Sequence, residues 1–202
     1  MMHFCKISAQ GVWLNEQLYF SPSKENSDWK KELYTHLELR YPKFFKMDDL
    51  SKMTIICFEV LKPKLNLELF ADDAIAVLLG NSSSSLYTDK LFANTYKIKQ
   101  QASPSLFVYT LPNITTGELA IKNKFYGENL FLIASSFKQM PFKNWVNLQL
   151  NNYSKACLGG WVEKTDILEE CFLFFTDQNL TQATINILNE KYNKKWMHLK
   201  QS

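Results

Sequence analysis

The sequence predicts a single α/β domain over residues 1–202, with a mostly parallel, mixed sheet flanked by helices. Two observations predict this class. Continuous apolar runs, such as residues 74–79, are typical of strands that are buried on both faces. Between these runs lie segments with the three- and four-residue apolar spacing of amphipathic helices, and strands that alternate with helices favour parallel pairing. Hydrophobic residues make up 46% of the 202 residues, which is enough apolar material for a packed core.

The N-terminal part predicts a strand or hairpin arm followed by two helices. The strand is expected within residues 4–14 and is followed by a polar loop. A helix is expected over residues 29–39, with Asp28 as its N-cap and Pro42 as its stop. A second helix is expected over residues 44–63, because its apolar residues recur with helical spacing and it ends at a proline.

The rest of the chain predicts buried strands that alternate with helices. The strands are expected at residues 74–79, 130–134, 155–163 and 171–176, and the helices at residues 88–99, 114–123, 138–151 and 179–192. Four consecutive serines, Ser82 to Ser85, follow the first of these strands. We expect a solvated turn there rather than a phosphate-binding loop, because neither GK[ST] nor GxGxxG is present.

Charge and cysteine usage exclude several classes of function. The 23 basic and 20 acidic residues give a net charge of +3, too balanced to indicate nucleic-acid binding. The four Cys contain no CxxC pair and lie among apolar neighbours, which is typical of reduced thiols in a cytoplasmic protein. The three His are not spaced as metal ligands, so we expect no metal and no cofactor. We expect no signal peptide and no membrane span, because no run of 18 apolar residues occurs.

Six short motifs occur in an order that resembles a known family. They are RYPKFFKMDDLSKM, AVLLGNSSSS, SPSLF, PNITTGELAI, YGENLFLIASS and LGGWVE. In this order they resemble the N-terminal half of β-ketoacyl-acyl carrier protein synthases, of the thiolase fold, over residues 40–165. The chain is most similar to short ketosynthase-like proteins of aryl polyene and flexirubin pigment pathways. The resemblance implies a thiolase-like half domain that acts in fatty acid, polyketide or pigment biosynthesis.

The resemblance also implies that the catalytic thiol is missing. In this family the nucleophile is a Cys at a strand-to-helix turn, where a helix N-terminus stabilises the thiolate. With Gly127 at the Gly of the family motif, the Cys position falls on Ser136, give or take one residue. The two His of the family lie in a C-terminal half that has no counterpart here. A serine without an adjacent base is a poor nucleophile, so the resemblance implies a pseudo-enzyme. The alternative is an acyltransferase or hydrolase that uses Ser136, with His36 or His3 as its base.

The resemblance further implies a protein partner. In the family, the strand that leads to the Cys pairs with its counterpart across a dimer axis. The implied interface residues are Leu130, Phe131, Leu132, Ile133 and Ala134. The partner is then a full-length ketosynthase or a second copy of the chain, and Phe137 and Met140 gate the acyl tunnel. An acyl carrier protein is a further candidate partner, because such carriers are acidic and Lys43, Lys46 and Lys52 form a basic patch. The alternative is that these lysines only face water.

Overall fold

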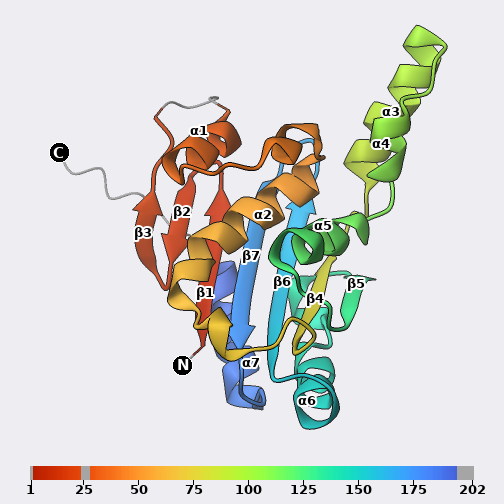
Figure 1. Ribbon diagram of the computed structural model, residues 1–202. Coiled ribbons are helices and arrows are strands. Elements are labelled where there is room, and N and C mark those ends of the chain that lie inside the picture. Colours follow the sequence, from red (N-terminus) through yellow and green to blue (C-terminus); the bar gives the residue numbers. More distant parts are fainter. Residues whose placement is uncertain (1, 24–27, 195–202) are drawn as a thin grey trace.

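The computed structural model describes residues 2–23 and 28–194, which form one seven-stranded mixed sheet with helices on both faces (Figure 1). The strands are β1 (His3–Ser8), β2 (Gly11–Leu14), β3 (Gln17–Phe20), β4 (Ile75–Asn81), β5 (Asn129–Ile133), β6 (Ala156–Lys164) and β7 (Glu169–Thr176). The helices are α1 (Trp29–His36), α2 (Asp49–Leu61), α3 (Leu86–Lys99), α4 (Pro104–Val108), α5 (Ile114–Asn123), α6 (Phe142–Asn152) and α7 (Gln182–Asn193). The strand order is β3-β2-β1-β7-β6-β4-β5.

The α/β class and the mixed sheet with flanking helices are confirmed, but the expectation that parallel pairs dominate is corrected. Among the described strands, two pairings are parallel, β4 with β5 and β4 with β6, and the other four are antiparallel. The reason is the short connections between β1, β2 and β3 and between β6 and β7, because strands joined by tight turns pair antiparallel. Strand β3 lies in the segment expected to be a loop. It is only four residues long, which is too short for a periodic pattern, and its Leu18 and Tyr19 are exposed despite their apolar character.

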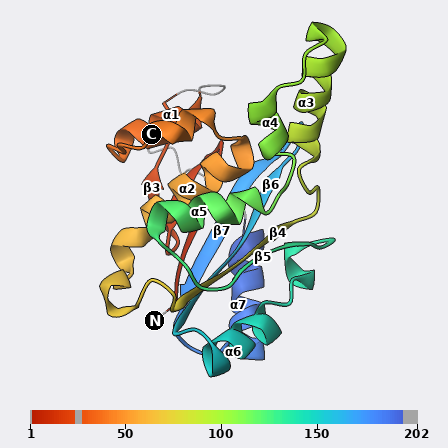
Figure 2. The same ribbon diagram turned by 45° about the vertical axis from the view of Figure 1, so that its right-hand side comes forward.

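Two hydrophobic clusters cover the two faces of the sheet. The first contains residues of α1, α2 and α5, and the second contains residues of α6 and α7. Helix α2 is the centre of the first cluster, because ten of its 13 residues are buried. Figure 2 shows the same arrangement from the side, with α2 and α5 on one face and α6 and α7 on the other. The expected helical periodicities therefore correspond to packed faces, as amphipathic helices require.

Three helices begin later than their periodicity predicted, and one of them is α7, which begins at Gln182 instead of residue 179. Asp48 caps α2 by accepting a hydrogen bond from the Ser51 N–H at 3.0 Å, and residues 42–46 form a separate 3₁₀ turn. Helix α6 begins at Phe142 because Pro141 supplies its N-cap, and residues 137–139 form a short 3₁₀ turn instead. The predicted cap of α1 is confirmed, since the Asp28 carboxylate accepts from the Lys31 N–H.

Helices α3 and α4 form an arm that projects from the body of the domain, as Figures 1 and 2 both show. The Phe92 and Phe107 rings, with centroids 5.5 Å apart, pack the two helices against each other. Much of the remaining apolar surface of the arm is exposed: Leu91, Tyr96, Ile98, Phe107, Val108 and Leu111. An apolar surface of this kind is typical of a protein interface.

Candidate functional site

The candidate site lies where the three parallel strands end. Gly80 on β4 is in register with Leu132 on β5 and with Trp161 on β6, so the C-terminal ends of the three strands lie side by side. The serine run follows β4, Ser136 lies just after β5, and Glu163 stands near the end of β6. In open α/β sheets, ligands bind beyond the C-terminal ends of the strands.

Ser136 is exposed and has an extended backbone. Within the described residues, its hydroxyl makes no hydrogen bond. The turn that it begins is a single 3₁₀ turn, residues 137–139, and α6 starts only at Phe142. The helix N-terminus that would stabilise an anionic nucleophile is therefore displaced from Ser136 along the chain.

The histidines considered as bases for Ser136 lie elsewhere. The His3 ring contacts the Asn15 side-chain amide at 2.9 Å in the N-terminal hairpin. The His36 ring packs against Tyr19 and Phe20, with centroids 5.8 and 5.1 Å apart. Both belong to the half of the sheet that contains β1 to β3, whereas Ser136 follows the edge strand at the other end. His198 lies outside the described residues.

The four thiols are buried and free, and none lies in the turn after β5. Burial raises the pKa of Cys157 to about 12. Burial also raises the pKa of Cys57 well above its usual value, as do its hydrogen bonds to the Cys171 and Cys5 carbonyls. A raised pKa keeps a thiol protonated and unreactive, so these cysteines pack as small apolar side chains.

The serine run is tied down by an internal carboxylate, a contact that sequence reasoning missed. One oxygen of the buried Glu163 carboxylate accepts from the N–H and the hydroxyl of Ser82, at 2.8 and 2.6 Å. The other oxygen accepts from the N–H and the hydroxyl of Ser83. The donors that a phosphate would need are therefore used by Glu163, and the expected solvated turn is held against β6. The only sequence signal was an acidic residue at the end of an apolar strand.

Strand β5 forms an edge of the sheet, so the expectation that it is buried on both faces is wrong. Its residues are half-buried or exposed, and Ile133 is 54% exposed. The backbone groups of Glu128 and Ala134 point towards β4. The Glu128 C=O accepts a hydrogen bond from the Val77 N–H, and the Ala134 N–H donates one to the Asn81 C=O. Because direction alternates along a strand, the N–H and C=O groups of Asn129, Phe131 and Ile133 point away from β4.

The side chains expected at a tunnel are buried on the α6–α7 face. The Phe137 ring packs against Phe142, Phe172 and Tyr192, with centroid distances of 5.0, 5.5 and 4.6 Å. Met140 lies against the backbone of β4, where a Cβ on Gly80 would come within 2.6 Å of its Cε. The two residues therefore form a dense layer directly behind the edge strands.

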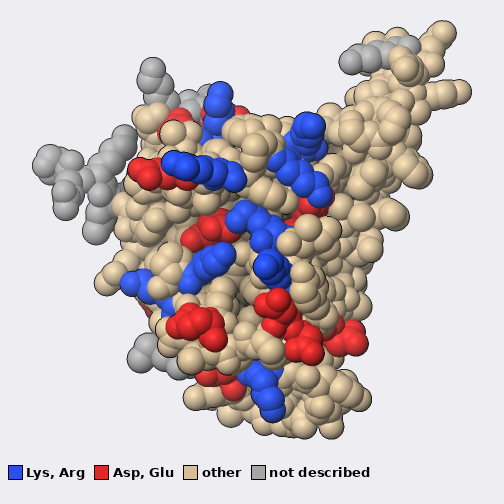
Figure 3. Space-filling view, in the orientation of Figure 1, with Lys and Arg blue, Asp and Glu red and all other residues tan. Residues whose placement is uncertain are grey.

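The residues of the predicted basic patch lie on the 3₁₀ turn over residues 42–46 and on α2. Figure 3 shows that Lys and Arg side chains gather in the upper part of this face, with Asp and Glu among them. Lys43 is paired with the buried Glu118 carboxylate at 2.6 Å. Lys46 is exposed, and Lys52 is half-buried at the wall of a cavity. Among residues 2–23 and 28–194, no cluster of three metal-ligating side chains occurs, and no helix is long and apolar enough to cross a membrane.

The chain is similar to solved ketosynthase structures, although its sequence matches no protein-family model and no curated protein. It aligns with a ketosynthase in complex with its chain length factor from Xenorhabdus doucetiae, at TM-score 0.60 and 14% identity, covering 87% of this chain and 77% of that one. It aligns with the ishigamide ketosynthase/chain length factor at TM-score 0.60 and 13% identity, covering 88% of this chain and 61% of that one.

A third match is a type II polyketide synthase acyl-carrier protein in complex with its ketosynthase bound to the hexaketide, at TM-score 0.58 and 11% identity. It covers 87% of this chain, which spans 61% of the matched chain. At this level of identity the likeness shows the fold. The chain therefore has a ketosynthase-like, thiolase-type fold, as its motifs predicted.

Proposed function

We propose that this chain is a non-catalytic, chain-length-factor-like subunit that pairs with a full-length ketosynthase in polyketide, fatty acid or pigment biosynthesis. The observation that carries the proposal is the turn after the edge strand β5, where Ser136 is exposed and where none of the four cysteines lies. Ser136 has no hydrogen-bonded base among the described residues, and the nearest helix begins six residues later, at Phe142. The free, buried thiols and the ketosynthase-like fold support a cytoplasmic location for this subunit.

The exposed edge of β5 supports the pairing step. Three outward-facing residues offer backbone N–H and C=O groups with no strand beside them in the described part of the chain. Such an edge binds another strand readily unless something covers it. The projecting α3–α4 arm begins after β4, the neighbour of β5, and lies on the same side of the molecule (Figure 1). One partner that covers both would bury the exposed apolar residues of the arm together with Ile133.

The first experiment compares the mass in solution of the chain alone and of the chain co-expressed with the ketosynthase from its own genome. We expect a stable one-to-one complex. Ile133→Pro removes an outward N–H without touching the bonds to β4, so it should abolish the complex. Ile133→Ala removes side-chain volume but keeps the N–H, and should retain most of the binding. A homodimer or monomer that ignores the ketosynthase would overturn the proposal.

The layer behind β5 supports a role in chain length. We propose that Phe137 and Met140 close the end of an acyl tunnel in the assembled pair, as bulky side chains in a narrow passage would. Met140→Ala, in a complex that still assembles, should then lengthen the product by one or more extension units. An unchanged product distribution from an intact complex would remove this role.

The enzyme alternative predicts a covalent intermediate on Ser136. We expect no adduct after incubation with an acyl-loaded carrier protein, because no residue among 2–23 and 28–194 makes a hydrogen bond to this hydroxyl that could activate it. Intact-mass spectrometry reads the result, with Ser136→Ala as the matched control. An added acyl mass that disappears in Ser136→Ala would support an acyltransferase or hydrolase instead. The same incubation, followed by size-exclusion chromatography, reports whether a carrier protein binds the basic patch of Lys43, Lys46 and Lys52.

A further inference from the structure

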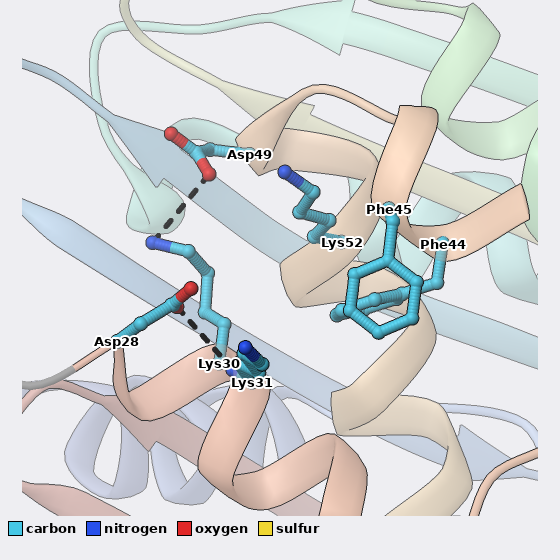
Figure 4. Close-up of a pocket in the computed structure, with 7 residues that line it drawn as sticks. All are labelled: Asp28, Lys30, Lys31, Phe44, Phe45, Asp49 and Lys52. Carbon is cyan, nitrogen blue, oxygen red and sulfur yellow. Dashed lines mark hydrogen bonds and ion pairs between the residues drawn. The ribbon is translucent and has the colours of Figure 1, made fainter. Parts of the chain in front are cut away.

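A cavity of about 260 Å³ lies between the first turns of α1 and α2 and the 3₁₀ turn that connects them (Figure 4). Seven residues line it: Asp28, Lys30, Lys31, Phe44, Phe45, Asp49 and Lys52. It is far from the turn after β5, because α1 and α2 pack over the β1–β7 half of the sheet. The cavity is therefore separate from the turn after β5, although Lys52 of the basic patch lies at its wall.

The carboxylates at this cavity are already engaged. Asp28 accepts from the Lys31 backbone N–H at 3.3 Å, as the N-cap of α1. Asp49 lies 3.5 Å from the Lys30 ammonium, which also contacts Glu169 at 2.9 Å. Both carboxylates keep their charge, since Asp28 is only hydrogen-bonded and Asp49 shares the Lys30 ammonium with Glu169, so any anion must bind on the side of the cavity formed by other groups.

Two ammonium groups remain without a carboxylate partner among the described residues, those of Lys31 and Lys52. Lys31 is exposed, whereas Lys52 is half-buried. The N-terminal ends of α1 and α2 both border the cavity, and their dipoles add positive potential there. The side of the cavity formed by Lys31 and Lys52 is therefore its positive side, where an anion would bind.

The third wall is aromatic. Phe44 is buried, but Phe45 is 54% exposed and stands edge-on to Phe44, with centroids 5.5 Å apart. In Figure 4 the two rings face the cavity opposite Lys30 and Lys31, with Lys52 between them. A flat apolar group can pack on Phe45 while its charged end reaches the ammonium groups. The volume suits a small molecule with one ring or a short chain.

We propose that this cavity binds a small phosphate monoester that carries a flat apolar group. The phosphate dianion lies between Lys31 and Lys52, and the apolar group packs on Phe45. Lysine ammonium groups are point-charge donors to phosphate, and each charged contact made away from bulk water contributes to affinity. This site does not depend on the proposed partner function.

The probe is phenyl phosphate, titrated into the isotope-labelled chain and followed by heteronuclear NMR. We expect shifts confined to the first turns of α1 and α2 and to the turn between them. Inorganic phosphate lacks the ring and benzoate lacks the second charge, so both should bind at least threefold more weakly. Shifts spread evenly over the lysines of the protein, or equal binding of all three probes, would overturn the proposal.

Variants separate this site from general charge attraction. Lys31→Met and Lys52→Met keep the aliphatic stem and should each weaken phenyl phosphate binding about threefold to tenfold. Phe45→Ala should weaken phenyl phosphate but leave inorganic phosphate unchanged. Lys46→Met is the matched control, because Lys46 is exposed on the same face but does not line the cavity, and it should change binding less than twofold. Equal loss in Lys46→Met and Lys52→Met would show that only the overall charge matters and would overturn the site.

Discussion

Glu163 on β6 binds Ser82, which lies 81 residues earlier in the chain, through both the N–H and the hydroxyl of that serine, at 2.8 and 2.6 Å. Ser83 makes the same two kinds of contact to the other carboxylate oxygen. A single buried carboxylate therefore fixes the loop after β4 against the end of β6. This contact fixes the loop at the C-terminal end of β4, and the α3–α4 arm begins directly after that loop.

Replacing this carboxylate with an amide should destabilise the fold. In Glu163→Gln one acceptor oxygen becomes an NH₂ group that faces donors, so two of the four hydrogen bonds are lost. We expect the free energy of unfolding to fall by about 1.5–3 kcal/mol, as for hydrogen bonds to a buried charged group. Urea denaturation measures the change. Glu68→Gln, at an exposed residue, should shift it by less than about 0.5 kcal/mol. Equal shifts in the two variants would contradict this role.

Glu169 predicts how stability depends on pH. Burial alone would raise the pKa of Glu169, but hydrogen bonds from Lys164 and Lys30 outweigh burial and lower the pKa to about 2, from 4.5. A lowered pKa means that the stabilisation is complete above about pH 4.5 and is lost as the pH falls towards 2. Because the carboxyl group is partly exposed and its ion pairs are screened by solvent, we expect a loss of about 1–2 kcal/mol over that window.

The measurement for Glu169 is the free energy of unfolding from urea titrations at a series of acidic pH values. Glu169→Gln should be less stable than the parent near neutral pH, and its stability should decrease less steeply between about pH 4.5 and pH 2. A parallel acid slope in the parent and in Glu169→Gln would show that other carboxylates cause the acid dependence.

The sequence was sufficient to predict the strands that are buried inside this chain. Strands β4, β6 and β7 were predicted because their apolar runs are continuous, and the cap of α1 was predicted from Asp28 alone. Residues 130–134 have the same kind of apolar run, yet β5 is a half-exposed edge. That a separate protein covers this run is a prediction of the proposed pairing, which the Ile133→Pro experiment tests.

Contacts between distant segments account for most of what the sequence did not predict. The bonds from Glu163 to Ser82 and Ser83 depend on the register of β4 with β6, which local periodicity does not specify. The cavity beside Lys52 forms because α1 and α2 begin side by side. Capping residues determine where each helix begins, Asp28 for α1 and Asp48 for α2, and the apolar pattern does not. The antiparallel half of the sheet follows from short turns, whose weak signal was outweighed by the alternation of strands and helices.

The buried thiols predict resistance to alkylation. All four cysteines are buried, and burial raises the pKa values of Cys57 and Cys157. Iodoacetamide at mildly alkaline pH should therefore leave the native chain unmodified, whereas the chain in concentrated guanidinium chloride should gain four carbamidomethyl groups. Intact-mass spectrometry counts them. Modification of one cysteine in the native chain within minutes would reveal an accessible thiolate and would reopen the question of a cysteine nucleophile.

Two adjacent residues in the turn after β5, Ser136 and Phe137, should contribute very differently to the free energy of unfolding. The Phe137 ring is only 3% exposed and packs in an aromatic cluster with Phe142, Phe172 and Tyr192, so Phe137→Ala should cost about 3–5 kcal/mol of unfolding free energy. Ser136→Ala removes an exposed hydroxyl and should change the free energy by less than about 0.5 kcal/mol. Urea denaturation of both variants gives the two values. A large loss in Ser136→Ala would mean that the hydroxyl makes a stabilising contact, and a small loss in Phe137→Ala would mean that the layer behind β5 is loosely packed and able to open for an acyl chain.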